Sequence, residues 1–323
     1  MSSGNSKPRA RAVVYRYGDG VYAQKWYQRH IQWPGISLLA LLVVGLFAVT
    51  WQQRVALIGN DRTMVANTSV KSDTTGLIGQ TTGDRALADN IVDLQPLLDE
   101  WGQRHSGERW SVVAKSIDGP SFDAHLNENS LYEAASLYKL FLTLPLKDKL
   151  PLEKWQQTRM QVGDKNRTVA ECVDMMIRLS DNPCGEAIGS YVGWSKATNA
   201  IKAAGFTRTD LTLGSDDQFQ TAASDVASYL QQLDLQLLPE KMREKVLTSM
   251  AKQTFRQGIP AGCPGCTVQD KIGNINRVLH DAGIVTYSRG KYVLVIMSED
   301  NHDYREIAKL AGQIQQRILD ESE

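Results

Sequence analysis

The sequence of 323 residues predicts an α+β domain whose single antiparallel sheet is assembled from both ends of the domain, around a helical middle. Three observations predict this organisation. Segments rich in β-branched and aromatic residues, bounded by turn residues, lie early in the domain and again after residue 267. Between residues 152 and 252 the pattern is mainly helical. Ahead of the domain lies an apolar segment, residues 34–51, followed by a polar stretch.

The N-terminal segment has the charge and hydropathy pattern of a membrane anchor. Residues 34–51 are apolar over a length near the lower limit for a transmembrane helix, and Trp33 and Trp51 stand at the two ends. Six Lys or Arg residues and a single acid, Asp19, precede this segment. They predict a cytoplasmic arm over residues 1–33, with the rest of the chain outside the cell membrane. A cleaved signal peptide is the alternative, but no convincing small-x-small cleavage site follows the apolar core.

Residues 52–84 are rich in Thr, Ser, Gly, Asn and Asp and show no sustained periodicity, so we expect a flexible linker. The domain then occupies residues 85–323. The chain balances 36 Lys and Arg residues against 36 Asp and Glu residues. This balance gives no indication of a nucleic-acid partner, and we expect none.

Local patterns predict the elements of the domain in order. Residues 87–104 are expected to form a helix with one apolar side. A strand is expected at residues 110–117, and Asp118-Gly-Pro predicts a turn before a second, weaker strand. Three further strands, expected at residues 267–272, 283–287 and 291–297, bring the sheet to five strands. A helix at residues 303–319 is expected to close the chain.

The domain is organised around residues 131–144, which are expected to form a buried helix because their apolar residues recur at helical spacing. Ser136 and Lys139 are three positions apart, so both side chains would lie on the same helix face. Serine is a weak nucleophile unless a base takes its proton, and a lysine of lowered pKa can be that base. Ser-x-x-Lys also arises by chance in a chain of this length, so the interpretation needs partners.

Two further polar fragments are candidate partners. Thr168-Val-Ala-Glu171 has the form of a capping box, and the helix that it begins should end before Ser180-Asp-Asn182. This triplet would form a tight connection to a second helix, which Asn182 can cap. Lys271-Ile-Gly273 ends an expected strand, where Lys271 can project into a cleft and Gly273 lets a substrate backbone approach. In isolation, ordinary capping residues are the favoured interpretation of the first fragment, and a surface lysine at a strand end is the favoured interpretation of the second.

In this order the three fragments match a known set. Ser-x-x-Lys, Ser-Asp-Asn and Lys-x-Gly on a late strand are the ordered motifs of class A β-lactamases and penicillin-binding proteins. Residues 86–320 therefore resemble class A β-lactamase-like serine hydrolases, with further likeness in Thr221-Ala-Ala-Ser-Asp and His280-Asp-Ala-Gly. The resemblance implies a five-stranded antiparallel sheet flanked by helices, an all-helical subdomain, and a cleft between the two.

The resemblance also implies roles for individual residues. Ser136 would be the nucleophile, and Lys139 would accept or relay its proton. Ser180 would pass that proton to the leaving nitrogen of the substrate. Lys271 would support this transfer with its positive field and would depress the pKa of Lys139. Asn182 would hydrogen-bond the amide side chain of the substrate.

The third motif implies the oxyanion hole and contains one departure. Beside Gly273, the backbone N–H groups of Ser136 and Asn274 would stabilise the oxyanion. Ile272 stands where the family normally has a Thr or Ser whose hydroxyl helps to bind the substrate carboxylate. Arg277 is a possible substitute for that hydroxyl.

A second departure concerns release of the acyl group. Class A β-lactamases carry a Glu-x-x-Leu-Asn loop after Ser-Asp-Asn, whose Glu activates the deacylating water. This chain has no such motif, and Asp210, Asp216 and Asp217 are shorter carboxylates at a different spacing. Acylation followed by slow deacylation is therefore expected.

The four cysteines are expected to form two disulfides, because the domain is expected outside the cell. Cys172 and Cys184 flank Ser180 on the two predicted helices, and Cys263 and Cys266 precede the Lys271 strand. A zinc site lacks a matching second half, and a redox-active pair at 263–266 lacks the helix start that such thiols usually have. Neither a metal nor a cofactor is expected.

The expected function is that of a membrane-anchored, extracytoplasmic serine hydrolase that acts through an acyl-enzyme. Its substrates would be β-lactams or the D-Ala-D-Ala-type stem peptides of peptidoglycan. Two alternatives remain open at this point. One is a penicillin-binding receptor or sensor, and the other is a catalytically inactive binding domain.

Overall fold

The computed structural model describes residues 13–17, 20–24, 91–212 and 219–321. The chain divides into two units, residues 1–79 and 80–323, which are described separately. In the first unit, β1 (Val13–Tyr17) and β2 (Gly20–Gln24) pair as an antiparallel hairpin within the predicted basic arm.

The predicted transmembrane helix at residues 34–51 and the predicted linker at residues 52–84 lie outside the described residues. Among the residues that are described, no helix combines the length and the apolar composition that a membrane span requires.

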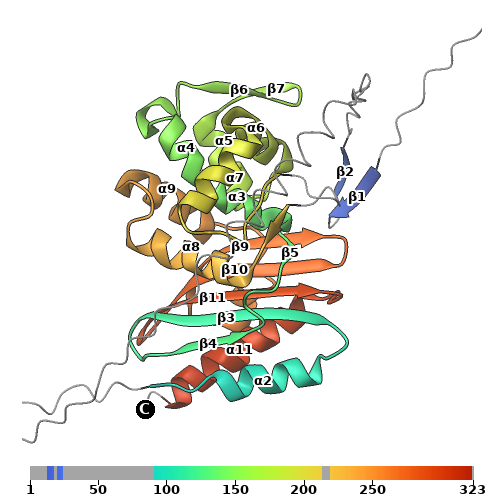
Figure 1. The fold of residues 1–323 in the computed structure, drawn as a ribbon, viewed down its shortest axis with the longest axis vertical. Coiled ribbons are helices and arrows are strands. Elements are labelled where there is room, and N and C mark those ends of the chain that lie inside the picture. The colour runs from blue at the N-terminus through green and yellow to red at the C-terminus, as the bar shows by residue number, and fades with distance from the viewer. Residues whose placement is uncertain (1–12, 18–19, 25–90, 213–218, 322–323) are drawn as a thin grey trace, which may run out of the picture. The chain divides into compact units, whose positions relative to one another are not determined.

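The second unit contains a five-stranded antiparallel sheet in the order β4-β3-β11-β10-β9 (Figure 1). Its strands are β3 (Arg109–Asp118), β4 (Asp123–Leu126), β9 (Thr267–Ile275), β10 (Val278–Tyr287) and β11 (Gly290–Glu299). The early strand β3 pairs directly with the last strand β11, so the sheet is assembled from both ends of the domain, as predicted.

The late strands are longer than predicted. In β10, the polar residues His280 and Asp281 are both fully buried and belong to the strand. Polar residues at these positions look like the end of a strand in sequence, because most strands carry such residues only on a solvent face. Burial of both polar side chains therefore marks an unusual part of the sheet, next to the edge strand β9.

Helices cover both faces of the sheet. On one face lie α2 (Gln95–Arg104), α10 (Ile259–Gly262) and α11 (Tyr304–Glu321), and their apolar residues form one core with the sheet. Leu98 and Trp101 of α2 and Ile314 of α11 are fully buried in this core. The predicted helix at residues 87–104 begins only at Gln95, where Pro96 favours the first turn of a helix.

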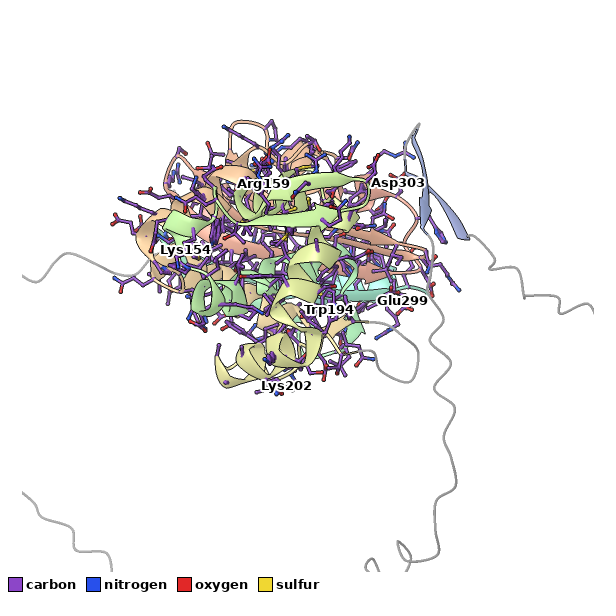
Figure 2. The ribbon with its side chains drawn as sticks, turned by 90° about the horizontal axis from the view of Figure 1, so that it is seen from above. Lys154, Arg159, Trp194, Lys202, Glu299 and Asp303 are labelled. Atoms are coloured by element: carbon purple, nitrogen blue, oxygen red, sulfur yellow. A yellow bond between two sulfur atoms is a disulfide. The ribbon has the colours of Figure 1, made fainter. Side chains whose placement is uncertain are left out.

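The helical part packs on the other face and forms a second core (Figure 1). Its helices are α3 (Tyr138–Phe141), α4 (Thr143–Lys149), α5 (Val169–Arg178), α6 (Asn182–Val192), α7 (Trp194–Ala203), α8 (Ala223–Leu235) and α9 (Glu240–Ala251). Figure 2 labels Trp194 and Lys202 towards the two ends of α7. The helical part is interrupted by a hairpin of β6 (Arg159–Val162) and β7 (Lys165–Thr168), which the sequence did not predict.

The segment around Ser136 is not one continuous helix. Residues Tyr132–Glu133 form β5, which pairs with β8 (Gln220–Thr221), and Ala135–Leu137 form a 3₁₀ helix that leads into α3. The prediction of a helix over residues 131–144 was therefore wrong at its start. Apolar spacing alone does not register that Tyr132 pairs with a segment far along the chain.

Candidate active site

Ser136 lies in the 3₁₀ helix at the start of α3, and Lys139 lies one turn further along the chain. The Ser136 Oγ and Lys139 Nζ atoms are 3.0 Å apart. Both side chains are buried, with Ser136 7% exposed and Lys139 fully enclosed. The hydroxyl and amine that the sequence placed one turn apart are therefore in direct hydrogen-bond contact.

The backbone before Ser136 is conformationally restricted. Ala135 has a φ of 43°, in the left-handed region that non-glycine residues rarely adopt. Such a conformation costs about 1–3 kcal/mol and persists only where the surrounding packing enforces it. The turn that presents the Ser136 hydroxyl is thus held by its neighbours, not by local preference.

Ser180 occupies the connection between α5 and α6. The capping box predicted at Thr168 is present, because its hydroxyl accepts from the N–H of Glu171 and the Glu171 carboxylate accepts from the N–H of Thr168. At the other end of the helix, Ser180 has a φ of 58°. This left-handed turn points the Ser180 carbonyl towards Lys139, whose Nζ donates to it at 2.6 Å.

The cap of α6 is Asp181 and not Asn182, which corrects the prediction. The Asp181 carboxylate accepts a hydrogen bond from the N–H of Cys184 at 2.8 Å. Asn182 is the first residue of the helix, and its Oδ1 accepts from Lys139 Nζ at 2.6 Å. Because Asp181 performs the capping, the amide of Asn182 faces the amine instead.

Lys271 projects from β9 to the same cluster. Its Nζ donates to Ser180 Oγ at 2.8 Å and to the carbonyl of Ile272 at 2.7 Å, and the side chain is fully buried. The structure therefore brings Ser136, Lys139, Ser180 and Lys271 into one hydrogen-bonded chain, although they come from segments far apart in sequence.

Burial dominates the electrostatics of the two lysines. It lowers the pKa of Lys139 to about 7, against smaller opposing effects of the nearby Asp181 and Glu186 charges. Burial also lowers the pKa of Lys271, and the charge of Lys139 lowers it further. We expected the charge of Lys271 to lower the pKa of Lys139. Instead, burial lowers the pKa of Lys139, and it is the charge of Lys139 that lowers the pKa of Lys271.

Gly273 packs tightly against the nucleophile segment. A side-chain carbon at this position would lie 3.2 Å from Ala135 Cβ and 3.1 Å from His280 Cδ2. The carbonyl of Gly273 accepts from the Tyr304 hydroxyl at 2.9 Å, and His280 Nε2 is 2.9 Å from the carbonyl of Glu133. Contacts from two directions thus fix the edge strand β9 beside Ser136.

His280 and Tyr304 were not predicted as site residues. Burial lowers the pKa of His280 to about 4, so the imidazole is neutral, and it bridges β10 to the segment that precedes Ser136. No sequence motif marks Tyr304. The signal for His280 was its place inside an apolar strand, where a buried polar residue must find partners.

The remaining predicted residues lie at the rim or elsewhere. Arg277 lies on the exposed turn between β9 and β10, is ion-paired with Asp300, and does not join the cluster. Asn274 is a half-buried residue of β9. Asp210 is held by Lys202 at 2.6 Å. Asp216 and Asp217 are outside the described residues.

The cysteines differ from the prediction in one pair. Cys263 and Cys266 form a disulfide. Cys172 and Cys184 are both buried and are not bonded in the structure, and their sulfur atoms lie next to each other, 2.6 Å apart. Hydrogen bonds and the helix cap fix the connection around Ser180.

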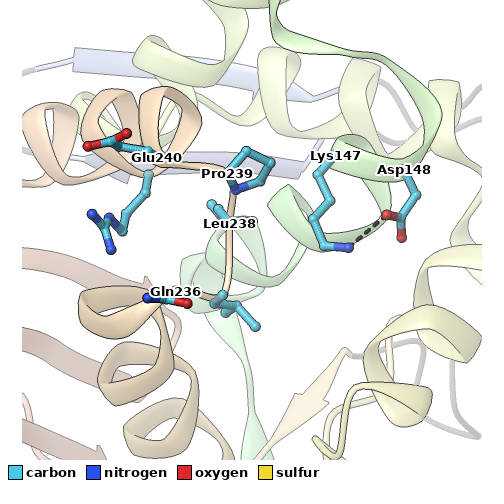
Figure 3. Close-up of a pocket in the computed structure, with 8 residues that line it drawn as sticks. Lys147, Asp148, Gln236, Leu238, Pro239 and Glu240 are labelled. Carbon is cyan, nitrogen blue, oxygen red and sulfur yellow. Dashed lines mark hydrogen bonds and ion pairs between the residues drawn. The ribbon is translucent and has the colours of Figure 1, made fainter.

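A separate surface hollow of about 680 Å³ lies between the end of α4 and the α8–α9 connection (Figure 3). Lys147 and Asp148 form an ion pair at 2.7 Å on its wall. None of its lining residues belongs to the Ser136 cluster. Polar convergence and perturbed pKa values mark the Ser136 cluster, and not this hollow, as the candidate site.

A family model and several solved structures match the domain. The model of the β-lactamase enzyme family matches residues 93–322. Among curated proteins, no match is found.

Several solved structures share the fold. PBP-A has a TM-score of 0.63 and 20% sequence identity, over 70% of this chain and 96% of that chain. A β-lactamase from Sphaerobacter thermophilus has a TM-score of 0.62 and 17% identity, over 72% of this chain and 98% of that chain. A point mutant of PBP-A was solved as an acyl-enzyme complex with penicillin G, with a TM-score of 0.61 and 19% identity over 70% of this chain and 96% of that chain.

Fold and family match together define a class A β-lactamase-like serine hydrolase that acts through an acyl-enzyme. The chain belongs to the β-lactamase enzyme family.

Proposed function

We propose that this protein is a membrane-anchored, extracytoplasmic hydrolase that β-lactams or D-Ala-D-Ala-type peptidoglycan peptides acylate at Ser136, and that releases the acyl group slowly. The hydrogen bonds of Lys139 carry this proposal. A neutral lysine amine has two N–H donors and one lone pair. Its two shortest contacts, to the Ser180 carbonyl and to Asn182 Oδ1, use both donors. The lone pair then faces Ser136 Oγ at 3.0 Å and can accept its proton.

A lysine can act as this base only if it is neutral near physiological pH. Burial lowers the pKa of Lys139 to about 7, so a large fraction of the amine is unprotonated there. In acylation, Ser136 Oγ bonds to the carbonyl carbon of the substrate and its proton passes to Lys139 Nζ. The amine and hydroxyl thus form a nucleophile and base pair of the kind that serine acyl transfer requires.

The leaving nitrogen needs a proton from the opposite side. Lys271 donates to Ser180 Oγ at 2.8 Å, which leaves the Ser180 hydroxyl proton available for another acceptor. The backbone carbonyl of Ser180 also accepts a hydrogen bond from Lys139 Nζ. We therefore assign Ser180 as the group that protonates the leaving nitrogen, with Lys271 orienting its hydroxyl.

The family and a related structure support the proposed substrate class. The PBP-A point mutant holds penicillin G as an acyl-enzyme, on the same fold. Asn182 and the backbone N–H groups of Ser136 and Asn274 would contact the substrate amide and the oxyanion. Ile272 supplies no hydroxyl for a substrate carboxylate, and Arg277, the possible substitute, is paired with Asp300 outside the cluster.

Slow release is proposed because no Glu-x-x-Leu-Asn loop follows Ser180 in the sequence. A penicillin-binding receptor or sensor is the second candidate function, and the same observation favours it. The membrane anchor is proposed from the apolar segment at residues 34–51 and the basic residues before it.

Intact-mass measurement with penicillin G tests the function. We expect a single covalent adduct that maps to Ser136, is absent in Ser136→Ala, and forms much more slowly in Lys139→Ala. An unlabelled wild-type protein, or an adduct retained in Ser136→Ala, would overturn the proposal. Turnover of a chromogenic cephalosporin separates the hydrolase from the receptor, because a receptor gives a stoichiometric burst without a steady state. Extraction of cell membranes with alkaline carbonate tests the anchor, since an anchored chain stays in the pellet.

A further inference from the structure

Two carboxyl groups lie buried in the sheet beside the strand that carries Lys271. Asp270 of β9 and Asp281 of β10 have no exposed surface. Neither belongs to the hydrogen-bonded chain around Ser136. Acidic side chains are almost never fully buried unless they are paired, because moving an isolated charge out of water is costly. Two such groups on neighbouring strands therefore need partners.

The register of the strands puts both carboxyls on the same face of the sheet. Asp270 lies opposite Gly283, and Asp281 lies opposite Ile272. Residues two apart along a strand share a face, so Asp281 is the diagonal neighbour of Asp270. Diagonal neighbours lie about 7–8 Å apart, a span that two carboxyl groups reaching towards each other can close. Gly283, directly opposite Asp270, has no side chain that would separate the two groups.

One oxygen of each carboxyl has a partner in the segment 256–259. Asp270 Oδ1 is ion-paired with Arg256. Asp281 Oδ2 accepts a hydrogen bond from the N–H of Ile259 at 2.8 Å. A Cβ at Gly258 would lie 2.2 Å from the same oxygen, so the backbone of the segment packs directly on this carboxyl. A single short segment thus contacts both groups.

The other two oxygens have no such partner. Asp270 Oδ2 and Asp281 Oδ1 are both buried, and neither makes a hydrogen bond within the part of the chain that the structure describes. An ionised carboxylate can only accept hydrogen bonds, so two ionised groups here would repel each other and leave both oxygens unsatisfied. One proton removes both problems, because a protonated carboxyl donates to an ionised neighbour.

The surrounding charges also balance with a single proton. Apart from the two carboxyls themselves, the charged groups that act on them are Arg256 and Lys271. A pair with one proton carries one negative charge, which the Arg256 guanidinium matches. Burial raises the pKa of Asp281 to about 7, and burial together with the Asp281 charge raises the pKa of Asp270. The environment therefore favours retention of a proton where an ordinary aspartate is ionised.

We propose that Asp270 and Asp281 hold one proton between Oδ2 of the first and Oδ1 of the second, and that this acid pair positions the strand of Lys271. Asp270 directly precedes Lys271, and successive residues of a strand point to opposite faces. The pair therefore lies behind the lysine, where it ties β9 to β10 and to the segment 256–259. Binding of the proton requires no substrate, whereas the positioning role rests on the proposed acylation of Ser136.

Infrared spectroscopy of the full-length protein tests for the proton. A protonated carboxyl has a C=O stretching band that an ionised carboxylate lacks. At a pH of about 6, below the raised pKa of Asp281, we expect such a band in the wild type and its loss in Asp281→Asn. The new amide would still accept from the N–H of Ile259 and would donate permanently to Asp270. Asp164→Asn is the matched control, because it removes an exposed carboxylate on the turn between β6 and β7, and it should keep the band.

Unfolding in a pH series measures the same proton. A folded-state pKa above the usual aspartate value stabilises the folded chain fully below a pH of about 4, and this stabilisation is lost as the pH rises to about 7. Relative to Asp281→Asn, the unfolding constant of the wild type should therefore rise by up to about tenfold per pH unit over this window. Parallel pH curves for the two proteins would overturn the shared proton, as would a wild-type spectrum without the band.

Labelling by a fluorescent penicillin tests the positioning role. Asp281→Ala leaves Asp270 Oδ2 without a partner and should label about tenfold more slowly than the wild type, less than the roughly 10²-fold that a misplacement of about 1 Å can cost. Asp281→Asn should restore the rate. Equal labelling of the two variants would overturn the positioning role. A wild type without any label would contradict the proposed acylation, while the infrared and unfolding measurements would still decide whether the pair holds a proton.

A second variant covers a failure of Asp281→Asn to fold. Asp270→Asn also removes the shared proton, because only one carboxyl then remains in the pair. We expect the infrared band to be lost in this variant as well. A band that persists in either folded variant would place the proton on another group and overturn the proposal.

Discussion

Replacement of Gly185 by Ala tests whether the position of the Lys139 amine controls acylation. Gly185 lies in the second turn of α6, with its backbone against the fully buried side chain of Lys139. A Cβ at this position would be 2.9 Å from Lys139 Cε and 2.6 Å from the Tyr138 hydroxyl oxygen. Neither neighbour has free space to retreat into, because both side chains are buried.

The displacement can be worked from these distances. Carbon atoms in contact lie about 3.5–4.0 Å apart, so the Lys139 side chain must move by roughly 0.6–1.1 Å from the 2.9 Å position. A misplacement of about 1 Å in a reacting pair can cost about 10²-fold in rate. The Ser136–Lys139 distance of 3.0 Å leaves no margin for such a shift. We therefore expect acylation to slow by about 100-fold.

Stability should change far less than activity. Alanine in a helix interior is more favourable than glycine by about 1 kcal/mol, whereas overpacking of a buried site costs about 1–3 kcal/mol. The two effects partly cancel, and a net loss of about 0–2 kcal/mol remains. The assay is the rate of labelling by a fluorescent penicillin, with thermal unfolding measured on the same samples. Gly107→Ala is the control, because nothing lies within 4 Å of the added carbon. Labelling of Gly185→Ala at the wild-type rate would refute the reasoning.

Two further predictions concern the same cluster. The labelling rate should rise with pH through about 7, because burial lowers the pKa of Lys139 to that value and only the unprotonated amine accepts the Ser136 proton. Stopped-flow labelling in a pH series measures this dependence. A rate that falls over the same range contradicts the prediction. Tyr304→Phe removes the donor to the Gly273 carbonyl at 2.9 Å and should cost about 1 kcal/mol of stability, measured by chemical unfolding, with slower labelling. Unchanged labelling would show that other contacts fix the edge of β9.

The fold was predictable because its signals are local. Strands rich in β-branched residues and separated by turn residues identified all five strands of the sheet, although their ends were placed too short. The capping box at Thr168 fixed the start of α5 to the residue. In both cases the deciding interaction is made by residues close in sequence, so that pattern and structure coincide.

The errors arise where distant parts of the chain decide the structure. β5 exists because Tyr132 pairs with Thr221, and no local pattern encodes that partner. Asp181 was overlooked as a cap because Asp181 and Asn182 are both good capping residues in sequence, and only the position of Lys139 assigns their separate tasks. The lowered pKa of Lys139 could be expected in direction, but its cause, burial, depends on the packing around it.

The arrangement of the sheet has a consequence for synthesis of the protein. A ribosome produces β3 and the Ser136 segment early, but the neighbours that complete the sheet, β9, β10 and β11, are made near the end of the chain. Until β11 emerges, β3 has only the short β4 as a strand partner, and Lys271 has not reached Ser180. Pairing over such long separations also slows folding, because a large loop must close first. A nascent chain therefore carries its serine long before that serine can react, and the proposed acylation of Ser136 can begin only when the C-terminal strands have joined the sheet.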